Sequence, residues 1–263
     1  MRTRGQVMSP FGVFHAARTA VRMIGRAAKV HAYEVALMAS VAAMAPLHLV
    51  GGGLDPSCGP RSPVQAHTAP TTRPVLLVHG LGGTKSSWSL LAQALSARGL
   101  TVEAVTYTPI GTSVEQLADR LVVEVHRMLS QTATDKVHLV GHSLGGVVIA
   151  QAIAGGRLNG LVDTVVTLGS PFGGTPWANL LPFGAIVRAL REDSPVLRRL
   201  ACAPVPDGVR WLAVTAALDM IVPGLRSVPA HTQAETVTVG GVGHNGMLLS
   251  REVVGRIVDA LPA

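Results

Sequence analysis

The sequence predicts an α/β fold: a mostly parallel central sheet with helices on both faces, preceded by an N-terminal helical segment. Strand-like segments alternate with helix-like segments over residues 74–263, and such alternation is typical of parallel sheets. Several of these strands are apolar along their whole length, which indicates that both faces of the sheet are covered. With 48% hydrophobic and 14% charged residues among its 263, the chain has enough apolar surface to bury such a core.

The expected elements follow one another from residue 74 onward. Strands are predicted at 75–79, 101–107, 137–141, 164–168, 210–215 and 236–239. Helices are predicted at 86–98, 113–130 and 144–154, with a last helix capped by Ser250. Ser113 opens the second helix, and Gln116 three residues later completes a capping box that satisfies two backbone N–H groups.

The N-terminal part differs in composition from the rest of the chain. We divide the sequence into a basic and apolar helical segment at 1–54, a linker rich in Pro, Ser and Thr at 55–73, and a folded domain at 74–263. Residues 10–33 predict a basic amphipathic helix, and the uncharged stretch 35–54 has about the length that spans a bilayer. Three interpretations stay open: a membrane anchor, a cleaved signal peptide, or a segment that packs on the folded domain.

The net charge of +7 is concentrated in this N-terminal part. Residues 1–73 contain eight basic and two acidic residues, whereas the rest of the chain contains 14 and 13. The folded domain is therefore nearly neutral, without the basic surface expected of a nucleic-acid-binding domain. The charge distribution argues against nucleic acid as a partner and favours a membrane surface.

The two cysteines, Cys58 and Cys202, are too far apart in the sequence for a CxxC redox or zinc motif. Two thiols and a single disulfide both remain compatible with the sequence. The pairing state is therefore left open.

The pentapeptide Gly-His-Ser-Leu-Gly at 141–145 carries the clearest chemical signal. It fits G-x-S-x-G, follows the apolar strand at 137–141 and precedes a predicted helix. This strand–turn–helix context is that of a nucleophile elbow, in which a serine hydroxyl projects above the sheet at the positive end of a helix. Gly141 and Gly145 are needed because the strained turn leaves no room for side chains. We therefore predict that Ser143 is a nucleophile.

A serine hydroxyl becomes a good nucleophile only beside a base that a third group holds in place. In a fold of this kind the acid, and then the histidine, follow the serine along the chain. His244 follows the strand at 236–239 in a glycine-rich stretch, which lets the loop carry the imidazole over the end of the sheet. His231 lies in a polar loop flanked by proline. We therefore predict that His244 is the base.

The acid is expected after a strand and before His244. Asp219 follows the strand at 210–215 among apolar neighbours, so its carboxylate needs a buried partner, and an imidazole would supply one. Asp163 stands at the start of a strand, hence at the opposite edge of the sheet, and Asp207 lies in a turn between Pro and Gly. Asp219 is accordingly predicted to orient His244.

An oxyanion hole needs two backbone N–H groups aimed at the developing negative charge. Leu144, directly after the nucleophile, supplies one, and the loop after the first strand supplies the other, with Leu81 following the flexible Gly80. His79 is predicted to brace this loop by hydrogen bonds. No part in proton transfer is assigned to three further histidines: His126, His138 and His142.

At these residues the chain resembles the compact bacterial triacylglycerol lipases of the α/β-hydrolase superfamily. The stretch Val78-His79-Gly80-Leu81-Gly82-Gly83 resembles their oxyanion loop, and the segments at 219–222 and 241–244 resemble their acid and histidine segments. The likeness covers residues 74–263 and leaves the first 73 residues without a match. It implies an α/β-hydrolase fold and hydrolysis of carboxylic esters through an acyl-enzyme, without a metal or organic cofactor.

The segment 171–206 is longer than a minimal enzyme of this kind needs. Its apolar part is predicted to form either a short lid or acyl-chain groove, or an ordinary packing helix between strands. The residues concerned are Trp177, Leu180, Leu181, Phe183, Ile186 and Val187.

Taken together, the sequence predicts a lipase or long-chain esterase at the cell envelope, either membrane-associated or secreted, with a lipid or ester as its substrate. A thioesterase, phospholipase or acyltransferase would use the same triad, because fold and triad do not determine the acyl donor. A non-catalytic, membrane-associated binding protein on the same scaffold is the alternative from another class.

Overall fold

The computed structural model describes residues 72–108, 111–180, 184–231 and 233–262, together with Gly25, residues 28–30 and Ala32, which are helical. Apart from these few positions and from residues 72 and 73, the predictions for 1–54 and for the linker at 55–73 lie outside the described residues. Within the described part of the chain, no helix combines the length and apolar character needed to cross a membrane.

The centre of the domain is a six-stranded sheet with the strand order β2-β1-β3-β4-β5-β6. All five pairings between neighbouring strands are parallel, which confirms the predicted α/β class. The strands are β1 (Val75–Val78), β2 (Val102–Ala104), β3 (Val137–His142), β4 (Val162–Leu168), β5 (Arg210–Ala216) and β6 (Ala234–Val239).

The edge strand β2 is shorter than predicted, because 101–107 was expected to be extended throughout. The chain leaves the ladder after Ala104, although the Val105 N–H still donates to the Leu77 carbonyl over 2.9 Å. Tyr107 then turns inward and is buried. Alternation along the sequence cannot reveal this departure, because it results from contacts with the neighbouring loop.

The main helices form where their end signals predicted them. Helix α3 (Val114–Thr132) begins with the capping box of Ser113 and Gln116, and α8 (Arg251–Ala260) begins where Ser250 accepts from the Val253 N–H. The other elements are η2 (Lys85–Trp88), α2 (Ser89–Ala97), α4 (Leu144–Ala154), α5 (Trp177–Leu180), α6 (Ala185–Ala189), α7 (Pro195–Cys202), η3 (Gly224–Ser227) and η4 (Asn245–Leu249).

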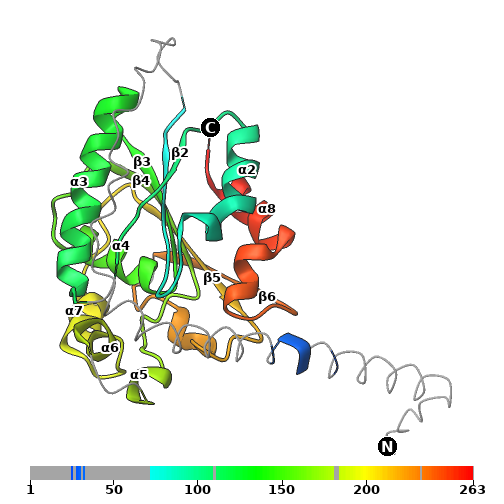
Figure 1. The fold of residues 1–263 in the computed structure, drawn as a ribbon. Helices are drawn as coiled ribbons and strands as arrows, with labels where there is room; N and C mark the ends of the chain where they lie inside the picture. The colour runs from blue at the N-terminus through cyan, green and yellow to red at the C-terminus, as the bar shows by residue number, and fades with distance from the viewer. Residues whose placement is uncertain are drawn as a thin grey trace, which may run out of the picture.

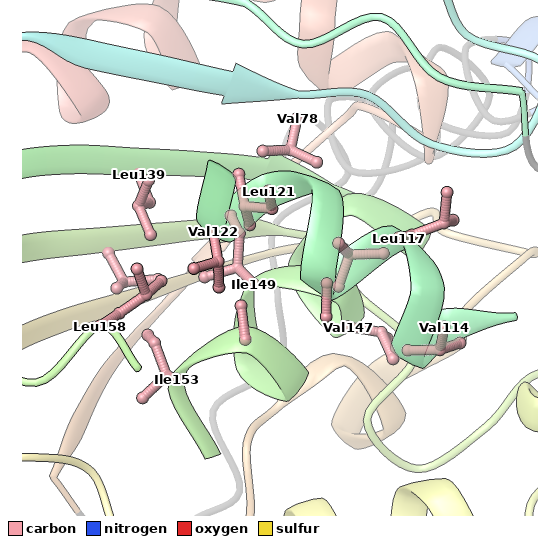
Figure 2. Packing of buried hydrophobic residues seen from close by; sticks show 14 of the residues in the cluster. Val78, Val114, Leu117, Leu121, Val122, Leu139, Val147, Ile149, Ile153 and Leu158 are labelled. Carbon is pink, nitrogen blue, oxygen red and sulfur yellow. The ribbon is translucent and has the colours of Figure 1, made fainter. Parts of the chain in front are cut away.

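Helices cover both faces of the sheet, α3 and α4 on one side and α2 and α8 on the other (Figure 1). On the first side, leucines of α3 such as Leu117 and Leu121 pack over the sheet residues Val78 and Leu139 (Figure 2). Burying one such leucine completely contributes about 2 kcal/mol. The two apolar layers explain why the inner strands lack polar alternation.

The strand order places two loops side by side at the carboxyl edge of the sheet. The chain first goes from β1 to β2 at one side of the sheet. It then crosses to β3 on the other side of β1 and continues from there through β4 and β5 to β6. In open α/β sheets ligands bind at the carboxyl ends of the strands where the order reverses. The loop after β1 and the turn after β3 meet at this point.

Candidate active site

Ser143 occupies a strained turn between β3 and α4. Its backbone has φ 54° and ψ −123°, and it is one of two residues other than glycine with positive φ in the described part of the chain. The Ser143 N–H donates to the Leu168 carbonyl of β4 over 2.8 Å, which ties the turn to the neighbouring strand. A non-glycine residue is held in such a conformation only by its surroundings, and such strain concentrates at functional sites.

The glycines around the serine are required by close backbone contacts. A Cβ on Gly141 would lie 2.6 Å from the Gly146 nitrogen, and a Cβ on Gly145 would overlap with the Val78 carbonyl oxygen. A Cβ on Gly80, in the loop after β1, would lie 2.9 Å from the Ser143 Cβ. The loop after β1, which is the predicted oxyanion loop, and the serine turn are therefore in direct contact.

Asp219 and His244 form a buried pair at the ends of β5 and β6. The Asp219 Oδ2 lies 2.8 Å from the His244 Nδ1, and the two residues are 7% and 3% exposed. A carboxylate only accepts hydrogen bonds, so Nδ1 carries the proton and Nε2 presents a lone pair that can take a proton from a serine. This is the tautomer that a general base needs.

The other oxygen of Asp219 is held by its own loop. Oδ1 accepts from the Ile221 N–H over 2.9 Å and from the Val222 N–H over 2.7 Å. A carboxylate with two backbone donors and one imidazole donor has its charge well compensated despite burial.

The loop after β1 forms a tight turn beside the serine. The Gly83 N–H donates to the Gly80 carbonyl over 3.1 Å, and Gly82 takes positive φ. Leu81 at its tip is partly exposed, with 39% of its surface accessible. Leu144 begins α4, so its N–H has no acceptor in the preceding turn of the helix. The two backbone groups predicted as oxyanion donors thus lie on neighbouring segments.

His142, directly before Ser143, makes a hydrogen bond to the loop that carries His244. Its Nε2 donates to the His244 carbonyl over 3.1 Å, and the two rings are 4.7 Å apart. Burial, with a smaller contribution from the charge of His244, lowers the pKa of His142 to about 3. It is therefore neutral under ordinary conditions and supports the loop that carries His244 as a hydrogen-bond donor.

Three further residues support the pair. Sequence reasoning did not single out Thr175 and Gly169, and it expected Trp177 in a lid or acyl-chain groove. The buried Thr175 hydroxyl donates to the Ile221 carbonyl, and the Trp177 indole donates to the Met220 carbonyl over 2.9 Å. Gly169, directly after β4 and with φ 54°, leaves room for the pair, because a Cβ there would lie 3.0 Å from both Asp219 Oδ2 and His244 Nδ1. Of these contacts, only that of Gly169 has a signal in the sequence, because Gly169 is a glycine directly after an apolar strand.

The rejected candidates lie away from this pair. Asp163 is ion-paired with Arg73 at 3.2 Å at the opposite edge of the sheet, and Asp207 is exposed in a turn. His231 stacks edge-on against Trp211 and lines an apolar pocket of about 230 Å³ beside α4 and α7. Within the described residues, no group of three or more His, Cys, Asp or Glu is arranged to hold a metal ion.

The proposed lid segment is divided into two short helices, α5 and α6. Ile186 is buried in the main core and Val187 packs against it, so for these two residues the structure supports the packing interpretation. Leu180 is 71% exposed, while Trp177 is anchored by its hydrogen bond. Leu181 and Phe183 lie outside the described residues. Cys202, at the end of α7, is exposed, and Cys58 also lies outside the described residues.

The parallel sheet, the strained serine turn and the buried acid–histidine pair define an α/β-hydrolase fold, and comparison with known proteins agrees. The model of the Alpha/beta hydrolase family matches residues 75–201. The mature form of Bacillus licheniformis lipase BlEst2 has a similar structure, with a TM-score of 0.61 at 18% identity, over 75% of this chain and 96% of that one.

Two bacterial relatives confirm the resemblance to triacylglycerol lipases. The lipase of Burkholderia plantarii is 30% identical over 157 residues, which is 56% of this chain and 43% of the relative. The lipase of Pseudarthrobacter phenanthrenivorans is 30% identical over 121 residues, 43% of this chain and 37% of the relative. The chain matches less than half the length of each, so its own activity requires a separate argument.

Proposed function

We propose that this chain is a serine hydrolase of carboxylic esters, a lipase or long-chain esterase that acts through an acyl-enzyme. The observation that carries the proposal is the buried Asp219–His244 pair, 2.8 Å between Oδ2 and Nδ1, at the same sheet edge as the strained Ser143. A nucleophile after β3, an orienting acid after β5 and a base after β6, at one edge of the sheet, form the combination that acyl transfer to serine requires.

In the proposed mechanism, Ser143 Oγ bonds to the ester carbonyl carbon while its proton passes to His244 Nε2. The carbonyl oxygen takes up the negative charge, which the N–H groups of Leu144 and Leu81 stabilise. The intermediate then collapses, the C–O bond to the alcohol breaks, and the alcohol leaves with the proton from His244. Asp219 remains ionised throughout and stabilises the transient imidazolium.

The acyl-enzyme is resolved by the same groups. His244 takes a proton from a water molecule, whose oxygen bonds to the acyl carbon, and returns the proton to Ser143 Oγ as the acid is released. The overall balance is one ester and one water converted to one acid and one alcohol.

The surface around the site supports a lipid substrate. Among the described residues, five of the six exposed large apolar side chains follow the carboxyl ends of β1, β4, β5 and β6. Exposed apolar groups on the segments that leave one edge of the sheet favour contact with an apolar partner. They are Leu81, Leu180, Met220, Leu225 and Leu249. The similarity to triacylglycerol lipases points in the same direction.

The experiment compares hydrolysis of p-nitrophenyl esters from acetyl to palmitoyl by the wild type and by Ser143→Ala. Serine-dependent turnover that rises with chain length would support a lipase, and turnover limited to short chains would indicate an ordinary esterase. Ser96→Ala, an exposed serine at the end of α2, is the control and should match the wild type.

A fluorophosphonate probe provides the second readout. Labelling of the wild type but not of Ser143→Ala would support an activated serine even where no ester is turned over, and would direct the search to thioesters, phospholipids or acyl transfer. A folded wild type that is neither labelled nor active would contradict the proposal and favour a binding protein.

We also propose that the protein acts at the cell envelope, on the basis of the basic and apolar composition of residues 1–54. Fractionation of cells expressing the full chain tests this. Recovery in the membrane or secreted fraction is expected, and intact protein in the soluble cytosol would contradict it.

A further inference from the structure

Tyr107 lies against the predicted oxyanion loop without belonging to it. Tyr107 lies three residues after β2, the strand that pairs with β1, and only 8% of its surface is exposed. Its hydroxyl donates a hydrogen bond to the carbonyl of His79, 28 residues away in the sequence. Its ring stacks on the imidazole of His79, with centroids 4.2 Å apart and planes inclined by 15°.

The acceptor in this hydrogen bond is the carbonyl from which the loop departs. The His79 carbonyl and the Gly80 N–H share one planar peptide unit, so a bond to the carbonyl sets the orientation of that whole unit. The next N–H along the chain is that of Leu81, the predicted oxyanion donor. A rotation of the first peptide unit would therefore change the direction of the second.

The loop is supported from several sides, and Tyr107 supplies the contact from β2. The serine turn borders the same carbonyl, because a Cβ on Gly145 would lie 2.9 Å from the His79 oxygen. The His79 Nδ1 lies 2.9 Å from the Gly80 carbonyl, so its N–H braces the loop internally, as predicted from the sequence. These internal bonds hold the loop's shape, whereas the phenol joins the loop to a different strand.

We propose that Tyr107 is a positioning residue for the oxyanion hole, whose hydroxyl keeps the Leu81 N–H directed at the reacting carbonyl. This inference rests on the proposed function. Burial raises the pKa of Tyr107 above its ordinary value, so the hydroxyl remains a donor over the working range of a serine hydrolase. The group touches neither the substrate nor the reacting atoms, and it acts through the His79 carbonyl alone.

Tyr107→Phe tests the proposal, because it keeps the stacked ring and removes only the hydroxyl. Losing an oxyanion donor outright lowers kcat about 10²–10³-fold, and a misdirected donor should cost less, about 10-fold. We expect that decrease in kcat on p-nitrophenyl butyrate with KM within about twofold, because the donor acts on the transition state and not on ground-state binding. Inhibition by an alkyl boronic acid, which forms a tetrahedral adduct on the serine, should weaken by a similar factor.

Thr132→Val is the matched control. Thr132 also donates a buried hydroxyl to a backbone carbonyl, that of Met128 over 2.8 Å, but in α3 and away from the site. It should lose stability without losing kcat or boronate affinity. Unchanged kcat in Tyr107→Phe, or a rise in KM alone, would overturn the proposal.

A second measurement applies even if Tyr107→Phe fails to fold. The chain contains two tyrosines, so a Tyr33→Phe background grown on 3,5-difluorotyrosine carries the substitution at Tyr107 alone. Fluorination preserves the shape of the ring and makes the phenol more acidic, so kcat should be lost at lower alkaline pH than in the unlabelled protein. If kcat were lost at the same alkaline pH in the labelled and the unlabelled protein, the proposal would be overturned.

The fluorophosphonate probe distinguishes failure of the proposed function from failure of the Tyr107 proposal. If the wild type hydrolyses no ester, the rate of fluorophosphonate labelling of Ser143 replaces kcat, since its phosphoryl oxygen occupies the same hole. Slower labelling in Tyr107→Phe would then support the positioning role although the ester assignment had failed, and equal labelling would overturn it.

Discussion

The turn that carries Ser143 and the pair formed by Asp219 and His244 are held in place by different means. The turn consists of consecutive residues, 141–146, packed so closely that a side chain on Gly145 would overlap with the backbone of β1. The pair joins residues 25 apart in the sequence. Its acid loop is held by hydrogen bonds from Thr175 and Trp177, which follow a different strand.

This difference predicts how each region responds to substitution. The turn depends on shape, so adding a single methyl group should disturb it even though no polar interaction is lost. The pair depends on hydrogen bonding, so a replacement of equal shape and different polarity should disturb it most. The following experiments separate the two kinds of dependence.

The largest effect is expected for Asp219→Asn. The amide preserves the shape but no longer favours the tautomer with a proton on His244 Nδ1, so kcat should fall about 10³–10⁴-fold with little change in fold. Steady-state hydrolysis of p-nitrophenyl esters measures this. Asp207→Asn, in an exposed turn, is the control, and an active Asp219→Asn beside an inactive Asp207→Asn would overturn the choice of acid.

Gly145→Ala tests the other side of the comparison. The added Cβ must displace the Val78 and His79 carbonyls, which moves the predicted oxyanion loop relative to Ser143. A misplacement of about 1 Å costs about 10²-fold in rate, and overpacking costs about 1–3 kcal/mol in stability. Gly255→Ala, in α8 with open space around it, should be stabilising and fully active. Wild-type activity in Gly145→Ala would mean that the turn does not depend on shape.

Thr175→Val should have a smaller effect on rate. It preserves the shape and leaves the Ile221 carbonyl without the hydroxyl that donates to it, so the free energy of unfolding should fall by about 1–3 kcal/mol. Because this carbonyl belongs to the loop that holds Asp219, kcat should also fall about threefold to tenfold. Comparison with Thr132→Val, which loses a similar bond far from the site, separates the two consequences. Equal kcat in both variants would show that Thr175 contributes stability alone.

The smallest effect on turnover is expected for His142, which directly precedes Ser143 and donates to the carbonyl of His244. Its pKa of about 3 in the folded protein lies below the unfolded value of about 6.5. Between these values the unfolded chain binds more protons, so stability decreases as pH falls below about 6.5, by up to about 1.4 kcal/mol per pH unit.

Denaturant unfolding between pH 4 and 8 measures this slope. His142→Gln should flatten it, while His126→Gln, at an exposed position on α3, should leave it unchanged. Burial also lowers the pKa values of His79 and His138, so part of the slope should remain. A slope unaltered by His142→Gln would show that His142 is not the group responsible.

Much of the fold followed from signals only a few residues long. Apolar strands, the capping box at Ser113 and the glycine-flanked Ser143 all act within one turn or one strand. Such signals are steric or periodic, so they can be read without knowing the rest of the molecule. The same local logic selected Asp219 and His244, because each follows a predicted strand that had to end at the same edge of the sheet, Asp219 among apolar neighbours and His244 in a glycine-rich stretch.

The supporting contacts could be known only from the tertiary structure. Tyr107 and His79 are separated by 28 residues, Thr175 and Ile221 by 46, and His142 and His244 by 102. No periodic pattern marks such partners, since the strand order β2-β1-β3-β4-β5-β6 decides which loops become neighbours. The sequence by itself therefore determined the candidate reacting groups and the strands that carry them. The order of the sheet decided which hydroxyls, carbonyls and glycines hold those groups in place, because these contacts exist only once distant strands have paired.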